Sequence, residues 1–518
     1  MMRDWDIVVV GTGFGGSMVA LAAVRAGLRV LLIERGRWVD RDDSAWDPQS
    51  ILIDRKYRSS SPFETPRFGV GRTQTFPDEA VGGKSVFYGA ASFRLREGDF
   101  RLRQRYPDLV SDLVDWPIDY GDLSPFYDAA ERLLGVVGVA GRDPTEPPRA
   151  EPYAGAPPPF SAPAQRVADA ATALGLHPFP IPLAINFTST DGRRPCVQCL
   201  TCDLFPCKIG AKNDLSVTVL PTAIAAGATV LHSTVALRLR RDGARVSAIE
   251  CLDTASGERF SLACRVCVVS AGAIPSAALL LASGLGAVGP SGSWIGRGLM
   301  RHCSGIVIGI FGAPTNPERV FHKQVALTDD YFGGAGGSPP GPWGMIQGLQ
   351  VPPPEYIAAE GGFPIGTLGA KTVDRQVFLL CIGQDLPDPA NRVEIDPGLT
   401  DRYGAPIPRV FHRYTRRDRQ VRTALYRQAA RVLRKAGALI RVRKPINTFS
   451  HALGTCRFGE DPTRAALDPW CRLFGVPNLF VVDASFMPSS GGVNPSLTIA
   501  ANALRVGEHL VADWDRLA

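Results

Sequence analysis

The chain has 518 residues, more than a single hydrophobic core usually supports, so two domains or one large composite body are expected. Hydrophobic residues make up 45% and charged residues 21%, the balance of an ordinary globular protein. The net charge of +7 comes from 57 basic and 50 acidic residues, and the densest basic run, residues 431–444, lacks an aromatic ladder. Nucleic acid is therefore not an expected partner. No signal peptide or transmembrane run is recognised, which makes a cytoplasmic location the default expectation.

The first predicted unit is a strand, a glycine turn, a helix and a second strand over residues 6–34. Gly11, Gly13 and Gly16 fit G-x-G-x-x-G, whose glycines permit the sharp turn, the approach of a pyrophosphate and close helix packing. Free N–H groups at the start of the helix favour phosphates. Glu34 ends the second strand, where an acid accepts hydrogen bonds from a ribose. The unit predicts a dinucleotide site, and its acid favours FAD or NAD over NADP.

Two unusual segments follow along the chain. Residues 80–94 form a second glycine-rich turn, in which Gly82 and Gly83 would let the backbone pass close to a flat ring system. The proline-rich segment 142–163 cannot run as a helix or a central strand. It is expected to be an extended surface connection or a lid.

A cysteine-rich loop, "CVQCLTCDLFPC", occupies residues 196–207. Its spacing is C-x2-C-x2-C-x4-C, formed by Cys196, Cys199, Cys202 and Cys207. Structural zinc sites usually divide their ligands into two separated pairs, so zinc is the weaker metal interpretation. Iron–sulfur clusters are often wrapped by one such loop, although the usual run has three residues before its last cysteine. An iron–sulfur cluster, zinc, disulfides and packed thiols all remain open.

The last predicted units lie near the end of the chain. Residues 268–284 predict a strand that ends at Ala271 and Gly272, followed by a helix. Residues 478–510 predict a strand that ends at Asp483, a loop, and a helix that begins near Pro495.

Together these segments resemble the glucose–methanol–choline (GMC) family of FAD-dependent oxidoreductases, nearest in pattern to its pyranose oxidase, bacterial sugar dehydrogenase and cholesterol oxidase branches. Residues 116–138 and 387–396 are also similar to that family. The resemblance implies an α/β fold in which a Rossmann-like FAD-binding domain with a parallel sheet joins an α+β substrate-binding domain with a mostly antiparallel sheet. The FAD-binding domain would comprise residues 1–100, 190–300 and 450–518, and the substrate-binding domain 101–189 and 301–449, with a probable lid at 142–163.

The expected chemistry is the oxidation of a CH–OH group by hydride transfer to flavin N5. As the hydride leaves, the hydroxyl proton must be removed, and a neutral imidazole can accept it. His451 fits this role, and the resemblance assigns Asn494 to hold the same oxygen. His302, in "GRGLMRHCSG", is expected to have a structural or substrate-pocket role.

The resemblance also implies the cofactor contacts. Val235 would receive the adenine, Asp483 would bind ribityl or phosphate groups, and Asn494 and Pro495 would border the isoalloxazine. The full set of expected FAD-binding residues is Gly11, Gly13, Gly16, Glu34, Gly83, Ser85, Val235, Ala271, Gly272, Asp483, Ala484, Asn494 and Pro495. Members with covalent flavin carry a histidine in the turn that matches "GGKSVFYG", which has none here. Non-covalent FAD is therefore expected.

The cysteine loop resembles the cluster-binding segment of bacterial sugar dehydrogenases, although other family members keep cysteines there without a metal. The expected substrate is a sugar, a glycoside or another cyclic or secondary alcohol. The alternatives are a lyase on the same FAD-containing fold and a sterol-type alcohol oxidase. The electron acceptor would be oxygen, a quinone or a redox partner protein, an oligomer is compatible with the sequence, and export with a partner subunit is a second option for its location.

Overall fold

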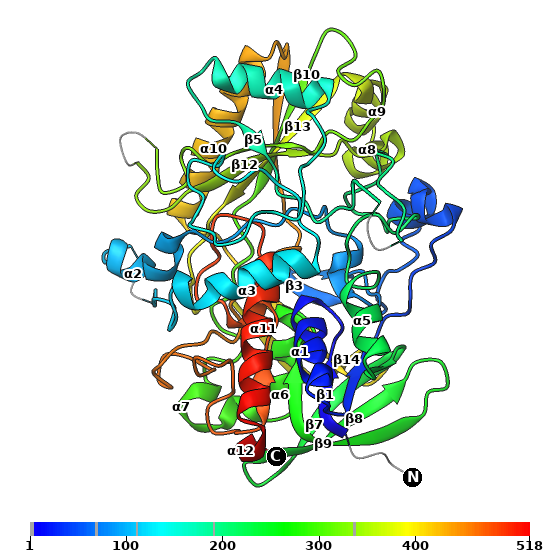
Figure 1. Ribbon diagram of the computed structural model, residues 1–518, viewed down its shortest axis with the longest axis vertical. Coiled ribbons are helices and arrows are strands. Elements are labelled where there is room, and N and C mark those ends of the chain that lie inside the picture. Colours follow the sequence, from blue (N-terminus) through cyan, green and yellow to red (C-terminus); the bar gives the residue numbers. More distant parts are fainter. Residues whose placement is uncertain (1–4, 68–70, 110–111, 190–191, 335–337, 518) are drawn as a thin grey trace.

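The computed structural model describes residues 5–67, 71–109, 112–189, 192–334 and 338–517. Figure 1 shows two halves along the long axis. The half with the chain ends holds a sheet of parallel and antiparallel strands, and the other half holds a second sheet beside helices α4 and α10. In the described part of the chain, no helix has the length and apolar character needed to cross a membrane.

The first sheet has seven strands in the order β6-β2-β1-β9-β8-β7, with β17 also paired to β9. Strands β6, β2, β1, β9 and β17 run parallel, whereas β7 and β8 form antiparallel pairs that continue from β9. The continuous β-branched run of β1 is fully buried, as expected for a strand covered on both faces. The strands are β1 (Trp5–Val10), β2 (Val30–Ile33), β6 (Thr229–Leu231), β7 (Thr234–Asp242), β8 (Arg245–Asp253), β9 (Arg259–Val269) and β17 (Leu479–Val481).

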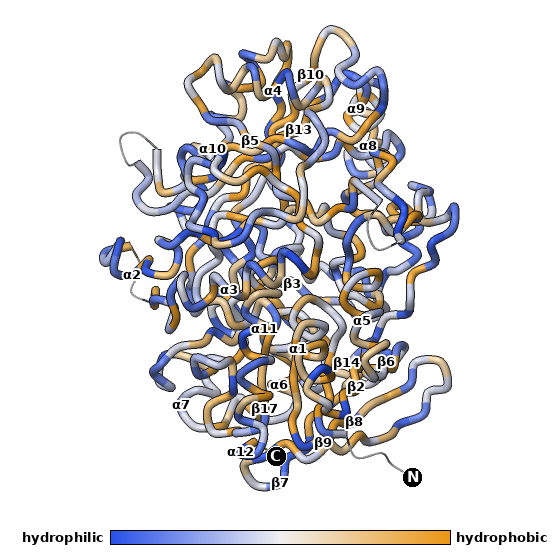
Figure 2. Tube along the Cα trace, viewed as in Figure 1, coloured by the Kyte–Doolittle hydropathy of each residue, from blue (hydrophilic) through white to orange (hydrophobic). Residues whose placement is uncertain are grey.

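Helices from both ends of the chain pack together on this sheet. Helix α1 (Phe14–Arg25) lies against α11 (Ser496–Ala512) and α5 (Val219–Ala225), and α6 (Ala273–Ala282) follows β9. A Cβ at Gly507 in α11 would lie only 2.9 Å from the Cβ of Ala22 in α1, so the glycine permits the close approach of the two helices. Figure 2 shows the hydrophobic residues along these inner elements. The predicted strand, turn and helix at the N-terminus and the helix start near Pro495 are confirmed.

The second sheet has six strands, all antiparallel, in the order β16-β10-β13-β12-β11-β5. Its two faces differ. Residues such as Leu379 and Cys381 pack against helices α10 (Arg416–Lys435) and α4 (Ala162–Thr172), whereas Leu380 and Ile382 join the main core. The strands are β5 (Phe179–Pro180), β10 (Gly305–Ile310), β11 (Val325–Leu327), β12 (Gly344–Leu349), β13 (Gln376–Gly383) and β16 (Ile440–Pro445).

A third, four-stranded sheet has the order β14-β15-β3-β4. It joins segments that the sequence assigns to different domains, since β15 pairs with β3. The domain boundaries therefore stay a prediction, while the α/β fold class is confirmed. The strands of this sheet are β3 (Phe63–Arg67), β4 (Gly71–Thr75), β14 (Arg392–Thr400) and β15 (Pro406–Phe411), and the remaining helices are α2 (Leu102–Arg105), α3 (Tyr120–Leu133), α7 (Gly289–Gly292), α8 (Pro354–Gly361), α9 (Ile365–Lys371) and α12 (Trp514–Leu517).

The proline-rich segment is an extended connection, as expected, until helix α4 begins at Ala162. Its helical end corrects the expectation that no helix forms within 142–163, because Pro163 lies in the first turn, where a proline needs no N–H donor. The segment is fixed to the body: Asp143 forms an ion pair with Arg96 at 2.5 Å, and Arg149 one with Glu131 at 3.1 Å. Its role as a lid stays a prediction.

Candidate active site

The first glycine turn places the backbone where a phosphate group can approach it. Gly11 has φ +98°, and a Cβ there would lie 2.4 Å from the carbonyl oxygen of Ser270. A Cβ at Gly16 would lie 2.1 Å from the carbonyl oxygen of Gly11, so close packing excludes a side chain at both positions. A Cβ at Gly13, in contrast, would have no heavy atom within 4 Å. Since α1 has no acidic residue in its first turn and no side-chain cap, its N-terminal N–H groups suit a pyrophosphate.

The second glycine turn lies directly on the first. The N–H of Gly82 donates to Oγ1 of Thr12 at 2.8 Å, and a Cβ at Gly83 would lie 3.0 Å from the Cα of Gly13. Ser85 does not present a free hydroxyl, because it donates to the Gly82 carbonyl and accepts from the N–H of Leu215. Its direct contact with a cofactor stays a prediction, and its hydrogen bonds hold the turn in shape.

Glu34 lies at the end of β2 and is held by hydrogen bonds. Its carboxylate accepts from the Thr12 hydroxyl at 2.7 Å and from the N–H of Gly36 at 2.9 Å. Burial raises the pKa of the Glu34 carboxyl. Strand β7 begins beside it, where the N–H of Thr234 donates to the Glu34 carbonyl, and this hydrogen bond brings the segment of Val235 next to Glu34. Contact of Val235 with an adenine stays a prediction.

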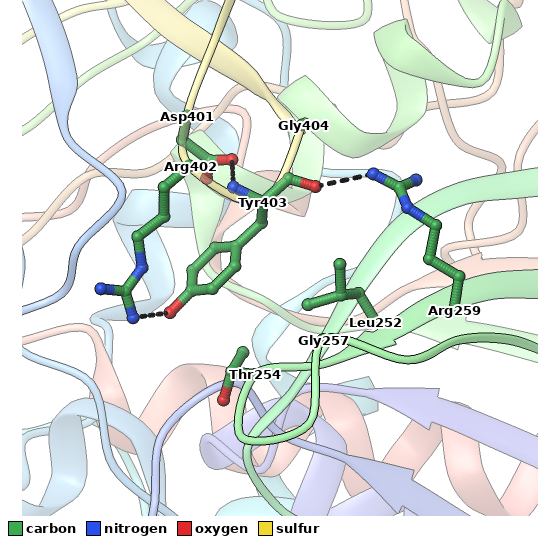
Figure 3. A pocket seen from close by; sticks show the side chains of 8 residues that line it. All are labelled: Leu252, Thr254, Gly257, Arg259, Asp401, Arg402, Tyr403 and Gly404. Atoms are coloured by element: carbon green, nitrogen blue, oxygen red, sulfur yellow. Dashed lines mark hydrogen bonds between the residues drawn. The ribbon is translucent and has the colours of Figure 1, made fainter.

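A cavity of about 760 Å³ opens next to Val235 (Figure 3). Leu252 and Tyr403 line it and also pack with Val235 in one apolar cluster. The two arginines that line it, Arg259 and Arg402, donate to the backbone and the hydroxyl of Tyr403. The cavity therefore lies beside the residue expected to receive the adenine, and its use by a cofactor stays a prediction.

The loop after β17 forms hydrogen bonds with the segment that follows β9 and with the segment that follows His451. Asp483 accepts hydrogen bonds from the N–H groups of Gly272 at 2.9 Å and Ser485 at 2.8 Å, and burial raises the pKa of its carboxyl. The N–H of Ala271 donates to the Ser276 hydroxyl. The carbonyl of Ala484 accepts from the N–H of Gly454, three residues after His451. The loop therefore fixes the catalytic segment against the cofactor-binding segment.

His451 contacts a second histidine, His302, through an Nδ1–Nδ1 distance of 2.9 Å. The Nε2 atom of His302 lies 3.0 Å from the carbonyl oxygens of both Ser490 and Gly491. Carbonyls only accept, so Nε2 of His302 must carry hydrogen, and in the neutral ring its Nδ1 is then an acceptor. Consequently Nδ1 of neutral His451 donates, and its Nε2 keeps a free lone pair. The pair holds His451 in the tautomer that a general base requires.

His302 is itself held in an unusual conformation. Its φ is +58°, in the left-handed region that non-glycine residues rarely adopt. The N–H of His302 donates to Asp385 Oδ1 at 3.0 Å, and its carbonyl accepts from the Tyr414 hydroxyl at 2.8 Å. The N–H of Arg301 donates to the other oxygen of Asp385. Strained backbone held by several contacts is typical of functional sites.

The surroundings of His451 keep its ring neutral. Burial, the neighbouring His302 ring and the positive charges of Lys84 and Lys323 together lower the pKa of His451 well below its usual range. Asn494 is part-buried, and its Oδ1 atom has no hydrogen-bond partner among the described residues, so that oxygen is left for a ligand. Pro495 directly precedes α11. Asn494 shares a loop with the two carbonyls that bind His302, which brings the two sequence-predicted catalytic residues to one region.

The structure gives the cysteine loop no metal-binding cluster of side chains. Cys196, Cys199, Cys202 and Cys207 are all free, and within the described ranges no three His, Cys, Asp or Glu side chains gather closely enough to hold a metal ion. The buried ammonium group of Lys212 contacts the backbone of the loop, since it donates to the carbonyls of Tyr88, Cys202 and Phe205. The expectation of an iron–sulfur cluster therefore has no support, and neither zinc nor disulfides has any.

The thiols of Cys199 and Cys196 differ in acidity. A hydrogen bond from Cys202 lowers the pKa of Cys199 to about 5, and burial raises the pKa of Cys196 to about 11.

The same loop also contributes an acid to an ion pair. Asp203 forms an ion pair with Lys323 at 2.6 Å, and this pair lies against Gly89 of the second glycine turn. Sequence reasoning missed Asp203, Lys323 and Asp385, and it did not pair His302 with His451. Only "GRGLMRHCSG" carried a signal, because it placed a histidine in a family-like stretch.

A glycine-rich turn at a helix start and a histidine pair are features expected of a nucleotide-dependent oxidoreductase. Family models described as GMC oxidoreductase match residues 156–304 and 387–503. The chain belongs to the GMC oxidoreductase family, as its sequence motifs predict. The family implies FAD as the cofactor, and the two glycine turns, the uncapped start of α1 and the unpartnered Asn494 oxygen fit it.

Known relatives extend over nearly the whole chain. The chain is 34% identical to paromamine 6'-oxidase from Streptomyces fradiae over 99% of its length and 92% of that protein. It is 33% identical to 6'''-hydroxyparomomycin C oxidase from Streptomyces lividus over 99% of its length and 93% of that protein. Among solved structures, pyridoxine 4-oxidase from Mesorbium loti matches the fold with a TM-score of 0.67, 23% identity, and coverage of 98% and 99%. The chain is an oxidoreductase that acts on CH–OH groups.

Proposed function

We propose that the protein oxidises an alcohol with His451 as the general base. The observation that carries the proposal is the histidine pair, which leaves the Nε2 lone pair of His451 free. When bound, FAD supplies a flavin that accepts a hydride. Nε2 of His451 accepts the hydroxyl proton, and Asn494 holds the same oxygen. Relatives named as oxidases of paromamine and hydroxyparomomycin C support a glycoside as the substrate and dioxygen as the electron acceptor.

The direct test is to add alcohols to the purified protein under anaerobic conditions and to follow flavin absorbance. We expect an alcohol to bleach the flavin, and air to restore its colour with about one hydrogen peroxide for each alcohol oxidised. A lyase on the same fold would convert its substrate without bleaching. If a quinone or a partner protein restores the flavin colour and air does not, the proposed electron acceptor, dioxygen, is wrong. The proposed alcohol oxidation would still stand.

The pH profile of flavin reduction gives a second prediction. Neutral His451 is the active form, so kcat/KM should rise with pH through the pKa of the free enzyme's base. Burial and the positive charges near His451 lower that pKa, so the ascending limb should have its midpoint below 6.5, the ordinary histidine value. Stopped-flow measurements from about pH 5 to 9 would locate it. A midpoint above 6.5 would contradict the assignment.

A further inference from the structure

Much of the positive charge of the chain lies in one segment. Residues 413–444 hold twelve basic residues and one acid, Asp418. Since the whole chain has a net charge of +7, its other residues carry a negative balance. Asp418 is buried and its side chain accepts hydrogen bonds from Thr415, so it adds little negative charge to the surface. The surface of this segment is therefore strongly positive.

Helix α10 carries part of this charge along its outer face. Its apolar residues, such as Val421 and Leu425, pack against the antiparallel sheet. Residues three or four positions apart lie on one face of a helix, and the exposed arginines of α10 occur at this spacing or at twice it. They are Arg416, Arg419, Arg427, Arg431 and Arg434. Asp330, which lies near Arg431, offsets one charge of this row.

Strand β16 extends the positive surface at the edge of the same sheet. Within the described part of the chain it pairs with β10 alone, and every one of its residues is exposed. Ile440 and Val442 are 56% and 44% exposed, and Leu439, just before the strand, is 70% exposed. The basic residues between and after them are Arg441, Arg443 and Lys444. Exposed apolar side chains gathered in this way mark an interaction site.

A second group of exposed apolar residues lies at the same end of the sheet. Ile310 pairs with Ile440 of β16 on one side and with Gln376 of β13 on the other. The amide of Gln376 donates to the carbonyl of Gly369 in α9. The exposed apolar residues of the hairpin formed by α8 and α9 are Phe363, Ile365 and Leu368. Among the described residues, six large hydrophobic side chains are more than half exposed, and five of them belong to this hairpin or to residues 439–440.

Figure 1 shows α9, α10 and β10, the partner of β16, in the half of the molecule away from the chain ends. We propose that this half docks on a membrane surface rich in anionic lipids. The arginine row of α10 and the basic residues of β16 would bind the lipid phosphates, while Leu439 and Ile440 enter the boundary between headgroups and acyl chains. Long basic side chains place their charge beyond an apolar stem, so both contacts can form together. The proposal does not depend on the reaction of His451.

Two other partners fit the same residues less well. A second copy of the chain would bring two arginine rows together, and like charges in contact are costly. A nucleic acid would bind the basic residues, but its bases stack on aromatic rings, and the exposed apolar residues next to these charges, Leu439, Ile440 and Val442, are aliphatic. An anionic membrane offers phosphates and an apolar layer side by side.

Co-sedimentation of the FAD-loaded protein with lipid vesicles tests the proposal. Vesicles of phosphatidylcholine with about 30% phosphatidylglycerol would be compared with vesicles of phosphatidylcholine alone. Each basic residue near an anionic surface contributes about fivefold to binding, so the partition coefficient should be about 100-fold or more higher for the anionic vesicles. Raising the salt from about 0.1 M to about 0.5 M should remove most of this difference, because salt screens the charges. Equal partition into the two kinds of vesicle, or none into either, would overturn the proposal.

Charge substitutions locate the contact. Arg443→Gln combined with Lys444→Gln should lower partition into the anionic vesicles by about 25-fold. The matched control is Arg238→Gln combined with Arg241→Gln, since both are exposed arginines of β7, the edge strand of the other sheet. The control removes the same charge and should bind as the wild type does. Equal losses in both pairs, or no loss in the β16 pair, would refute docking through β16.

Leu439→Ser combined with Ile440→Ser tests the apolar contact. This variant should lower partition by about tenfold or more, because two apolar side chains no longer leave water. It should keep the salt dependence of the wild type, since its charges are unchanged. Unchanged partition would overturn the insertion of these residues. The melting temperatures of all the variants should match the wild type, because every substituted residue is exposed.

The two other partners give different results. Analytical ultracentrifugation would detect a wild-type dimer that Leu439→Ser with Ile440→Ser abolishes, and gel electrophoresis would detect a complex with a DNA duplex. Either result without binding to the anionic vesicles would assign this face to that partner and overturn the proposal.

Discussion

Replacing His451 with alanine should leave FAD bound and slow flavin reduction by about two orders of magnitude or more, the usual effect of removing a positioned general base. The substitution removes the imidazole whose Nε2 atom is left unprotonated by the hydrogen bond between His451 and His302. Asn494→Ala should have a smaller effect, since it removes a contact to the same oxygen without removing the base. Anaerobic stopped-flow measurements on flavin-loaded enzyme would compare the two rates.

The control for this prediction is His177→Ala. The side chain of His177 is 69% exposed and pairs with Asp329, and neither residue takes part in the histidine pair. The control enzyme should reduce its flavin at the wild-type rate. If the His451→Ala enzyme did so too, the proposed mechanism would be wrong.

Replacing Gly13 with aspartate should remove FAD while the protein stays folded. Gly13 has φ −70° and ψ −170°, an extended conformation open to any residue, and its Cβ would meet nothing within 4 Å. An aspartate there would cap α1 and so stabilise the helix. Its carboxylate would also occupy the N–H groups that suit the pyrophosphate and repel that group. Since like charges in contact cost several kcal/mol, FAD affinity should fall on the order of 100-fold or more.

Gly13→Ser separates charge from size in this experiment, because serine also caps a helix but carries no charge. Flavin released by acid would be measured for both variants and the wild type, alongside circular dichroism. Flavin that stayed with the protein after acid treatment would contradict non-covalent binding. Flavin content at the wild-type level in the Asp variant would show that no pyrophosphate lies at Gly13.

The parts of the site that the sequence predicted correctly depend on local backbone geometry. Gly11 is a glycine because its φ is +98°, and Gly16 is one because a Cβ would lie 2.1 Å from the carbonyl oxygen of Gly11. Both requirements arise within the turn, so a short motif records them directly. The role of His302 depends instead on carbonyls at residues 490 and 491, which are remote in sequence. A backbone carbonyl has no sequence signature, so no pattern could predict the tautomer of His451.

The cysteine loop is a different case, in which a clear sequence pattern did not determine the structure. Four cysteines in twelve positions form a strong local pattern, yet the conformation of the loop is set by Lys212, which binds the carbonyls of Cys202 and Phe205. The spacing left an iron–sulfur cluster, zinc, disulfides and packed thiols open, and it carried no sign that the backbone of the loop binds a lysine.

The packing of α1 against α11 affects how the protein folds during its synthesis on the ribosome. Helix α1 is among the first elements to be synthesised, but α11, which packs on it, spans Ser496–Ala512, and β17, which extends the same sheet beside β9, spans Leu479–Val481. Until α11 is synthesised, α5 is the one helix of these two that can cover α1. A chain that stops before residue 496 should therefore leave part of α1 uncovered and bind FAD poorly.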